Sequence, residues 1–513
     1  MGEVYEKVIE IASRRGFFWP SFEIYGGLGG FYTYGNLGTR LKRNIEDLWR
    51  EIFVRRHGFH EIEDPIINPS RVFEASGHIQ HFREYVLECT RCGRVSRADH
   101  LIEEELGIPA QSIDGSEIER LVREGRIRCP DCDGELKEPA TFLTMFQTSI
   151  GARGEDVGYA RPEAAQGMFL NFRRCLQQAR GALPLGLAQV GKVLRNEIAP
   201  RRGLLRLREF TIMEVELFFD PQNPSCPWFE KVRDKEVAIL TEEMQGRGER
   251  NPVRMTLGEA ASKGLIRTEW QAYFMGLSEE FIEMLGIPGG RQRFRGHLPE
   301  ERAHYSAQTF DHEVYLESWG WVEVAGHAYR TDYDLSAHQR HSGVDMTVMR
   351  GDGTRFTPHV VEPSFGLDRL VYAALEASLR IREGRNILAL PPSIAPIKVS
   401  VFPLVAKDGL PEVAREVQRR LLDSQLASEY DERGSIGRRY ARSDEAGTPL
   451  AVTVDYQTLK DGTVTIRDRD SWRQVRQRIE DLPTLIKRYL RGEIAFSELG
   501  LESGDVEGRD LSC

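Results

Sequence analysis

Two arginines and a glutamate in this 513-residue chain have types and spacings that suit the binding of a nucleotide. Arg195 and Glu197 are two residues apart, and a basic loop separates them from a run of Arg, Glu, Phe and Thr at 208–211. Arg369 ends the distant run Glu362–Arg369. The planar guanidinium group makes bidentate contacts to phosphate oxygens and stays charged at any working pH. This set predicts a bent nucleotide whose phosphates lie between two arginines. Taken alone, Arg195 and Glu197 have the alternative of a surface ion pair across two strands.

A glycine-rich run over 25–31 is the second candidate for phosphate binding. No buried strand precedes it and no Lys-Ser or Lys-Thr pair follows, so the signal for a phosphate loop is weak. We interpret the run as a loop that places Tyr32 and Tyr34 ahead of a helix starting near Asn36.

Four of the seven cysteines form two Cys-x-x-Cys pairs, each in a turn with Gly or Pro. Two such knuckles supply four thiolates, which predicts a closed, structural zinc site with a small helical insert between the pairs. The alternative is a set of reduced, metal-free cysteines. The predicted ligands are Cys89, Cys92, Cys129 and Cys132.

Length and charge limit the class of protein. A chain of this size is expected to form two to four domains. It has no run of about 20 apolar residues and no apolar leader, so we expect a cytoplasmic protein without a membrane span. The formal charge of −10 argues against nucleic-acid binding by the whole surface. Local arginine clusters keep that role open, although solvated faces paired with acids are the alternative; the first cluster is Arg201, Arg202, Arg206 and Arg208.

Periodicity outlines the elements that must position these residues. Apolar spacing predicts helices over 3–15 and from Asn36 to about 56, and then a strand broken by proline over Gly58–Pro65. Alternation predicts strands at Leu187–Leu194, Phe210–Phe219 and Trp319–Ala325, the first two as an antiparallel hairpin. The segments 86–138, with the cysteine knuckles, and 221–310, charged and partly helical, are interpreted as insertions.

A compact α/β domain with a mixed sheet is predicted after about residue 396. Its predicted strands are Ile397–Leu404, Pro449–Val454 and Thr463–Asp468, and its predicted helices are Leu410–Ala427 and Trp472–Leu490. We expect this domain to span 396–495 and a polar, mobile tail to span 496–513.

Three patterns, in order, resemble the motifs of class II aminoacyl-tRNA synthetases. Gly58–Pro65 is similar to motif 1, the dimer element, Arg195–Glu216 to motif 2, and Ser364–Arg369 to motif 3. Further runs narrow the resemblance to the dimeric glycyl-tRNA synthetases of archaea, eukaryotes and some bacteria; they are 96–103, 161–167, 440–448 and 461–470. The chain departs from that pattern at Asn36, where the family usually has Pro, and at 81–83.

The resemblance implies an α+β fold. Its catalytic domain, residues 1–395, would hold an antiparallel sheet of six or seven strands flanked by helices, with the zinc-knuckle insertion, followed by a C-terminal α/β anticodon-binding domain. It implies a homodimeric glycine–tRNA ligase that activates glycine with ATP and Mg²⁺ and transfers it to the 3′ end of tRNA(Gly). Rival interpretations are a non-catalytic relative, an enzyme for alanine, serine or proline, and a DNA-binding zinc protein.

The resemblance also implies roles for single residues. Arg195 would hold the α-phosphate and Arg369 the γ-phosphate, as the two catalytic arginines, and Glu323 is a candidate Mg²⁺ ligand or ATP contact. The implied ATP-binding set is Arg195, Asn196, Glu197, Arg206, Leu207, Phe210, Glu323, Val324, Gly366 and Arg369. The implied glycine-binding set is Arg97, Glu163, Glu214, Glu362 and Ser364. The implied anticodon-binding set is Arg439, Arg442, Arg467 and Arg469.

The acids of the glycine-binding set suit an amino acid without a side chain. Several carboxylates can share the three donors of an ammonium group. Clustered acids raise one another's pKa, so the bound cation is expected to stabilise their ionised state. Close walls around the substrate Cα would then exclude alanine by overpacking.

Overall fold

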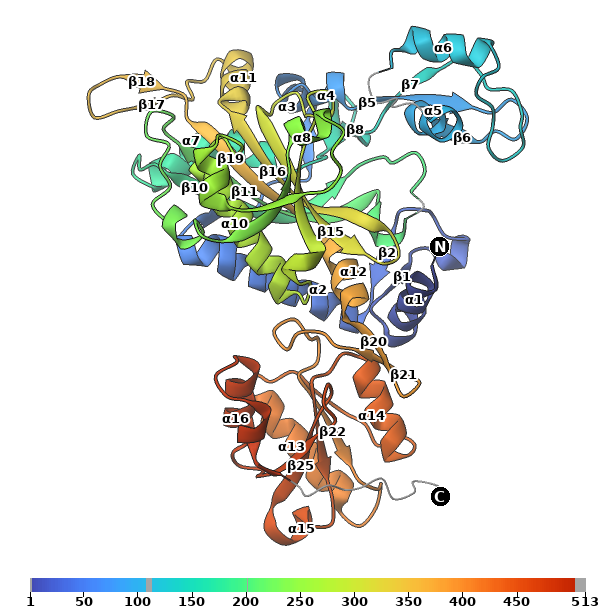
Figure 1. The fold of residues 1–513 in the computed structure, drawn as a ribbon, viewed down its shortest axis with the longest axis vertical. Coiled ribbons are helices and arrows are strands. Elements are labelled where there is room, and N and C mark those ends of the chain that lie inside the picture. The colour runs from blue at the N-terminus through green and yellow to red at the C-terminus, as the bar shows by residue number, and fades with distance from the viewer. Residues whose placement is uncertain (1, 108–112, 201, 503–513) are drawn as a thin grey trace.

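The computed structural model describes residues 2–107, 113–200 and 202–502. Its main body is a nine-stranded sheet in the order β13-β12-β14-β15-β16-β19-β11-β10-β3 (Figure 1). Neighbouring strands are antiparallel except at β12–β14 and β10–β3. The strands are β3 (His60–Glu61), β10 (Leu185–Leu194), β11 (Glu209–Phe219), β12 (Glu236–Leu240), β13 (Val253–Thr256), β14 (Gln292–Gly296), β15 (Gln308–Leu316), β16 (Gly320–Thr331) and β19 (His359–Gly366). The antiparallel sheet flanked by helices that the resemblance implies is present, with nine strands instead of six or seven.

The predicted hairpin is confirmed, because β10 and β11 pair along their whole length from Leu185↔Phe218 to Leu194↔Glu209. Side chains alternate across a strand. On β11, Met213, Val215 and Leu217 enter the largest hydrophobic core, while Glu214 and Glu216 point to the opposite face. The second face of β11 is therefore where this strand carries its polar groups.

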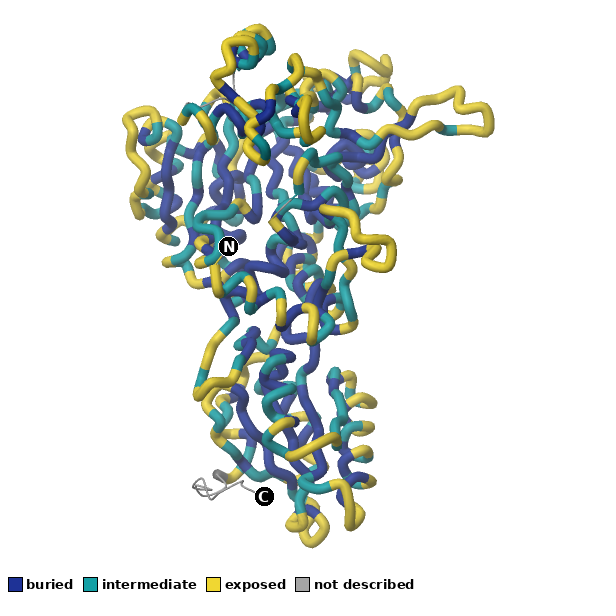
Figure 2. The backbone as a smooth tube through the Cα atoms, turned by 90° about the vertical axis from the view of Figure 1, so that its right-hand side faces the viewer, coloured by how far each residue is buried: buried dark blue, intermediate teal, exposed yellow. Residues whose placement is uncertain are grey.

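Helices cover both faces of the main sheet. The large core packs the sheet against α2 (Asn36–Trp49), α10 (Glu269–Met284) and α12 (Leu367–Ser378). On the other face, α7 (Ala165–Gln178) and α11 (Tyr333–Ser342) pack on the β10 side through a smaller core. Figure 2 shows buried residues, in dark blue, through the interior of the main body.

The segment 221–310 differs from the predicted insertion. Its helical part is present as α8 (Glu242–Gly246), α9 (Leu257–Ser262) and α10, yet it also contributes β12, β13 and β14 to the main sheet. Strand β14 alternates buried and half-buried residues, and its arginines lie on the half-buried positions. Because charged residues occupy every second position, the sequence at this edge of the sheet was interpreted as a solvent-exposed insertion.

The cysteine-containing segment forms a lobe that projects from the body in Figure 1. It has a three-stranded sheet, β6-β5-β7, and two helices with their own hydrophobic core around Leu87, Leu101 and Ile118. The predicted helical insert between the knuckles is present. The elements are β5 (Arg83–Glu88), β6 (Val95–Arg97), α5 (Ala98–Leu106), α6 (Gly115–Arg123) and β7 (Ala140–Leu143).

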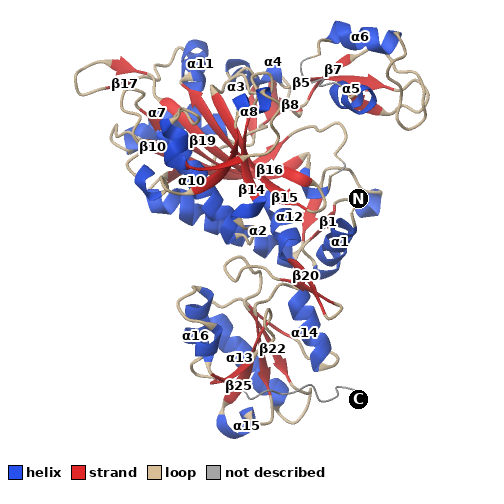
Figure 3. Ribbon diagram, in the orientation of Figure 1, coloured by secondary structure: helices blue, strands red, loops and turns tan. Residues whose placement is uncertain are grey.

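The C-terminal part is a second body with a mixed six-stranded sheet in the order β23-β22-β24-β25-β26-β27, as Figure 3 shows below the main sheet. Strand β22 is parallel to β23 and β24, and the later pairs are antiparallel. The mixed sheet predicted from the sequence is confirmed. Its elements are β22 (Val399–Pro403), α13 (Leu410–Asp423), β23 (Ser428–Tyr430), α14 (Ile436–Glu445), β24 (Leu450–Val454), α15 (Thr458–Asp461), β25 (Thr463–Asp468), β26 (Gln474–Arg478) and α16 (Leu482–Leu490).

Two predictions for this part need correction. The helix predicted over Trp472–Leu490 begins only at Leu482, because 474–478 pairs with β25 as strand β26. The tail predicted from residue 496 begins with an ordered turn, Phe496–Leu499, and with β27 (Leu501–Glu502), which pairs with β26. The rest of that prediction, at 503–513, lies outside the described residues.

The remaining elements are short apart from the first helix. They are α1 (Glu3–Arg15), β1 (Phe18–Pro20), β2 (Tyr32–Tyr34), β4 (Ile67–Pro69), α3 (Ser70–Ala75), α4 (His78–His81), β8 (Gln147–Ile150), β9 (Asp156–Ala160), β17 (Val348–Met349), β18 (Arg355–Phe356), β20 (Leu379–Arg382) and β21 (Arg385–Leu388). Across the described ranges, no helix is long and apolar enough to cross a membrane.

Candidate active site

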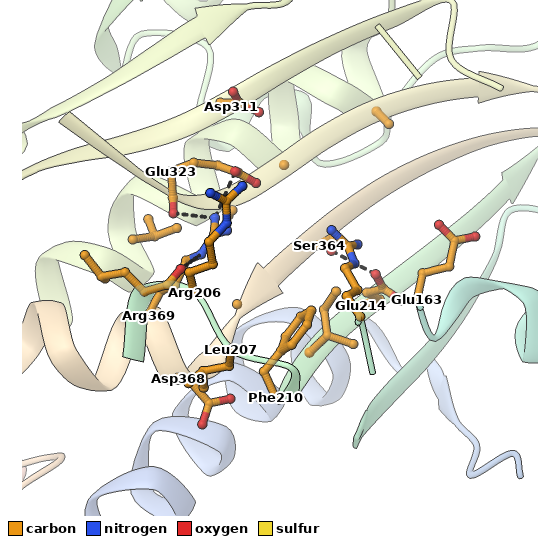
Figure 4. Close-up of a pocket in the computed structure, with 18 of the residues that line it drawn as sticks. Glu163, Arg206, Leu207, Phe210, Glu214, Asp311, Glu323, Ser364, Asp368 and Arg369 are labelled. Atoms are coloured by element: carbon orange, nitrogen blue, oxygen red, sulfur yellow. Dashed lines mark hydrogen bonds and ion pairs between the residues drawn. The ribbon is translucent and has the colours of Figure 1, made fainter. Parts of the chain in front are cut away.

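A cavity of about 270 Å³ opens on the face of the main sheet that carries Glu214. Its walls come from β11, β16 and β19, from the start of α12 and from the loop before β11. Figure 4 shows two chemically different ends: Arg206, Arg369, Glu323 and Asp311 gather at one, and Glu163, Glu214 and Ser364 gather at the other, with Phe210 between them. Strand alternation and pairing bring together residues that are far apart in the sequence.

The basic end holds two arginines in fixed positions. Arg369 donates from Nη1 to a carboxylate oxygen of Glu323 at 2.8 Å and from Nε to the carbonyl of Leu205 at 3.1 Å. The Nε of Arg206 lies 3.0 Å from Glu197. Because their acceptors are protein groups, these guanidinium groups are oriented before any ligand binds.

Arg195 lies between the two ends. Its Nε donates to the carbonyl of Pro162 at 3.0 Å, and its guanidinium carbon lies 5.5 Å from the centre of the Phe210 ring. Nine of the ten residues predicted to bind ATP line the cavity, but Asn196 does not. The backbone N–H of Asn196 donates instead to the carbonyl of Thr144.

The acidic end is built on two neighbouring strands. Glu214 accepts from the hydroxyl of Ser364 at 2.9 Å and from the backbone N–H of Ala164 at 2.8 Å. Glu163 and Glu362 stand beside it, and all three glutamates are almost fully buried. The acids predicted for glycine binding are therefore gathered at one place.

The sequence did not indicate Arg330, which pairs with acids of this end and is not part of the cavity wall. Its side chain is fully buried and donates to Glu362 at 2.5 Å, to Glu163 at 3.3 Å and to both oxygens of Asp334. Its guanidinium carbon lies 3.7 Å from the centre of the Tyr305 ring. The predicted strand stopped at Ala325, whereas β16 continues to Thr331. Burial does not alternate strictly along β16, so the local pattern carried no signal for Arg330.

Glu216 and Asp334 were also missed, and we use the term acid cluster for the five carboxyl groups of Glu163, Glu214, Glu216, Asp334 and Glu362. Burial, with the charges of Glu362 and Glu163, raises the pKa of Glu214 to about 8. Burial likewise raises the pKa of Glu216 and Glu362. Burial also acts to raise the pKa of Glu163, but Arg330 and His78 hold it well below its ordinary value.

Asp368, next to Arg369, anchors the basic end to the N-terminal segment. It accepts from the Tyr34 hydroxyl at 2.6 Å, from Lys42 at 3.2 Å and from the backbone N–H of Thr211 at 2.6 Å. The glycine-rich loop therefore places Tyr34 ahead of a helix that starts at Asn36, as predicted. Through its contact with Asp368, Tyr34 supports the start of α12.

Arg97 does not join the acid cluster, contrary to its predicted contact with glycine. It lies on β6 of the cysteine lobe, with bonds to Asp99 and an ion pair with Glu84 at 2.5 Å. A second cavity of about 200 Å³ has Arg97 in its wall together with Glu197 and Arg206. The projecting lobe places Arg97 near the nucleotide end instead. The position of the lobe relative to the main sheet could not be predicted from the local sequence around Arg97.

The four predicted cysteine ligands converge in the lobe. Their sulfur atoms all lie within 4.8 Å of one another, with Cys89 and Cys132 at 3.5 Å and Cys92 and Cys129 at 3.6 Å. A tetrahedral zinc with Zn–S bonds of about 2.3 Å separates its sulfurs by about 3.8 Å. The donor set therefore fits a zinc ion.

The arginines predicted to contact the anticodon are mostly interior groups. Arg467 pairs with both oxygens of Asp444, at 2.9 and 3.1 Å, and Arg439 and Arg469 donate to backbone carbonyls. These three are buried, so the structure does not support them as RNA contacts. Arg442 remains partly exposed and pairs with Asp431. Arg201, in the other basic cluster, lies outside the described residues.

Comparison with known proteins matches two families to the two bodies. The tRNA synthetase class II core domain (G, H, P, S and T) matches residues 146–378, and the anticodon binding domain matches residues 398–489. A glycine–tRNA ligase of Aeropyrum pernix is 45% identical over 97% of this chain and 99% of the relative. Those of Pyrococcus furiosus and Methanocaldococcus jannaschii are 43% and 40% identical, each over 95% of this chain and 99% of the relative.

Proposed function

Since this chain belongs to the archaeal-type glycine–tRNA ligases of the class II synthetases, we propose that it joins glycine to the 3′ end of tRNA(Gly) in the cavity of Figure 4. The observation that carries the proposal is the two-ended cavity, with arginines for a triphosphate at one end and buried acids for an ammonium group at the other. A carboxylate held between the ends would meet the α-phosphate of ATP.

Activation is the first step. A carboxylate oxygen of glycine attacks the α-phosphorus of ATP, the bond to the β-phosphate oxygen breaks, and diphosphate leaves with its electron pair. Arg195 holds the α-phosphate, Arg206 and Arg369 hold the outer phosphates, and Phe210 stacks on adenine. Positioning and charge neutralisation supply most of such a rate enhancement. The protein contacts of Arg369 and Arg195 support these roles, because they fix both side chains in advance.

Magnesium fits the basic end through carboxylate oxygens. Glu323 and Asp311 both line it, and hard oxygen donors of this kind suit the ion. When bound with ATP, the ion would neutralise phosphate charge. Burial raises the pKa of Asp311, and the nearby charge of Glu323 raises this pKa further. A cation bound between the two acids would therefore favour their ionised forms.

Glycine is selected by its ammonium group. Glu163, Glu214 and Glu362 accept its three donors, and Ser364 orients Glu214. In the second step the 3′ hydroxyl of tRNA attacks the carbonyl carbon of the adenylate, and AMP leaves with the electron pair of the broken bond. The leaving phosphate can take the proton, so no protein base is assigned.

The C-terminal body would bind the anticodon. Arg439, Arg467 and Arg469 are buried in the interior of this body. Of the four arginines predicted to bind the anticodon, the half-exposed Arg442 is therefore the one that RNA could contact. The exposed Arg433 and Arg438 precede it in the sequence. Arginine can contact phosphates and stack on splayed bases. Arg438→Glu should therefore weaken aminoacylation through tRNA and leave ATP–diphosphate exchange unchanged.

The lobe would hold a structural zinc ion on its four cysteines, since its donor set is closed and the lobe has a small core of its own. A second copy of the chain would cover the motif 1 region. Three exposed apolar side chains support this homodimer: Ile66, Ile67 and Val157 are each 40 to 42% exposed, and Ile67 lies on β4 beside β9, which carries Val157. Ile67→Asp should raise the dimer dissociation constant in analytical ultracentrifugation.

ATP–diphosphate exchange with each of the twenty amino acids tests the activity. Exchange with glycine alone is expected, and Arg369→Ala should abolish it. Arg419→Ala is the matched control, because Arg419 is an exposed arginine on α13 of the C-terminal body. Folded, zinc-loaded protein that gives no exchange with any amino acid would contradict the proposal and favour a non-catalytic relative.

A further inference from the structure

The acid cluster contains more carboxyl groups than its cations can balance. The buried guanidinium of Arg330 pairs with three of the five carboxyl groups, those of Glu163, Asp334 and Glu362. Arg161 also faces Glu214, but its own donors bond to the carbonyls of Asp64 and Lys192. Full ionisation would leave several uncompensated charges in a site removed from water, which is strongly unfavourable.

Glu216 and Asp334 are the members that the mechanism does not use, and Glu216 alone of these two has no hydrogen bond with Arg330. Glu216 lies on β11 two residues beyond Glu214, and both side chains point to the same face of the sheet. The pairing of Glu214 with Ser364 and of Leu217 with Val361 puts Glu216 directly opposite Glu362. Its side chain is fully buried, and neither of its oxygens has a hydrogen-bond partner among the described residues. Glu216 is not in the cavity wall.

These positions give the two acids of β11 different environments. Glu214 reaches the cavity and has two donors, the Ser364 hydroxyl and the Ala164 N–H. A hydroxyl can donate to an ionised carboxylate or accept from a protonated one, so Ser364 can serve both states of Glu214. Glu216 has no such donor to stabilise a charge and faces the carboxyl group of Glu362.

We propose that glycine binds by exchanging its ammonium group for a proton on Glu214, while Glu216 keeps its own proton throughout and remains a neutral neighbour of Glu214 and Glu362. This inference rests on the proposed function. In the exchange the O–H bond of Glu214 breaks, its proton passes to solvent, and the carboxylate accepts an N–H of glycine.

The surroundings of Glu214 support this assignment. Several charged and polar groups face Glu214. Glu216 comes from the same strand, and Glu362 and Ser364 come from β19. Glu163 and Arg161 come from the segment before α7, and Arg330 comes from β16. His78 of α4 lies 3.4 Å from Glu163, so it reinforces the ionised state of that acid and not of Glu214. The elevated pKa of Glu214, about 8, agrees with a proton that glycine can displace near neutral pH.

The exchange would also contribute to selectivity. While Glu214 is protonated, the acid cluster presents less negative charge to cations in the solvent, because Glu214 is the acid on β11 that reaches the cavity. Small inorganic cations would have to displace that proton without offering three directed N–H donors. An ammonium group supplies those donors, so it recovers the energy of deprotonating Glu214 through charge-assisted hydrogen bonds.

Calorimetric titration of the full-length, zinc-loaded protein with glycine tests the exchange. Heats measured in phosphate and in Tris, whose ionisation enthalpies differ, give the number of protons released. We expect about 0.9 proton at pH 7 and about 0.1 at pH 9, from a pKa of about 8. Glycine that binds at pH 7 with no proton release would overturn the inference and leave the proposed function intact. Glycine that does not bind at all would contradict both.

Two isosteric variants separate the acids. Glu214→Gln should lose the proton release and bind glycine more weakly by about tenfold or more. Glu216→Gln, which replaces a neutral acid with a neutral amide, should keep the release and keep the dissociation constant for glycine within about twofold. Equal losses in both variants would show that Glu216 is charged. If a variant fails to fold, infrared difference spectra of the wild type decide: glycine should remove one protonated-carboxyl band, and an unchanged spectrum contradicts the exchange.

Discussion

Asp368 accepts a hydrogen bond from the backbone N–H of Thr211 at 2.6 Å, so the first turn of α12 is fixed to strand β11. The neighbouring residue, Arg369, therefore points into the cavity from a position that is set by the sheet. The same carboxylate pairs with Lys42 of α2 at 3.2 Å. Three elements that meet only in the folded chain thus share one buried carboxylate.

The pair of Asp368 and Lys42 gives a stability prediction. Removing one partner leaves the other buried and uncompensated, so Asp368→Asn and Lys42→Met should each reduce the free energy of unfolding by about 3–5 kcal/mol. The double variant should lose less than the sum of the two single losses, as urea unfolding curves would measure. Additive losses would show that the two side chains do not interact.

Arg330 is predicted to hold the acidic end together. Arg330→Met leaves Glu163, Glu362 and Asp334 without their shared cation, so it should cost about 3–5 kcal/mol in stability and abolish exchange with glycine. Arg330→Lys keeps the charge but loses the planar fork, and it should raise the KM for glycine. Unfolding curves and exchange kinetics measure both effects. A fully active Arg330→Met would contradict this role.

Zinc removal should affect the lobe and spare the main sheet. Cys129→Ser, or a strong chelator, should release the metal and increase hydrogen exchange over 86–138, because binding energy at such sites is folding energy. The strands around the large core should keep their protection. Cys175→Ser is the control, since Cys175 lies on the buried face of α7 and outside the ligand set. Unchanged exchange in the lobe after metal loss would refute a structural role.

Stability should fall as the pH rises towards 8. The carboxyl group of Glu214 has an ordinary pKa of 4.5 and a pKa of about 8 in the folded protein, where burial disfavours the charge. The folded state therefore binds more protons between these values, so the stabilisation present below about pH 5 is lost as the pH passes through 8. The Tm of Glu214→Gln should decline less over this range. Glu209→Gln, at the half-exposed start of β11, is the control and should follow the wild type.

Stacking by Phe210 predicts a selective effect on ATP. Phe210→Leu keeps an apolar side chain but removes the aromatic face, at a cost of up to about 1–3 kcal/mol in nucleotide binding. The KM for ATP should rise by about fivefold or more, while the KM for glycine should stay within about twofold. Steady-state exchange kinetics measure both constants. An equal rise in the two would indicate a general distortion of the cavity.

Local patterns in the sequence carry much of this site. Arg195, Glu197 and Phe210 were recognised because a hairpin keeps its own residues in register, and the structure pairs β10 with β11 as predicted. The cysteine knuckles were recognised because ligand spacing is a short-range property, and the four sulfurs do converge. The C-terminal sheet followed from alternating strands and helices, although β26 was taken for part of a helix.

The sequence by itself indicated candidate residues for phosphate and zinc from residue type and short spacing, and the family resemblance added the acids implied for the ammonium group. Only the tertiary structure decided the neighbours of each charge. It buried Arg439, Arg467 and Arg469, moved Arg97 to the nucleotide end and paired Arg330 with the acid cluster. Burial and pairing across distant strands change the energy of a charged group by several kcal/mol, and neither is written in the local sequence.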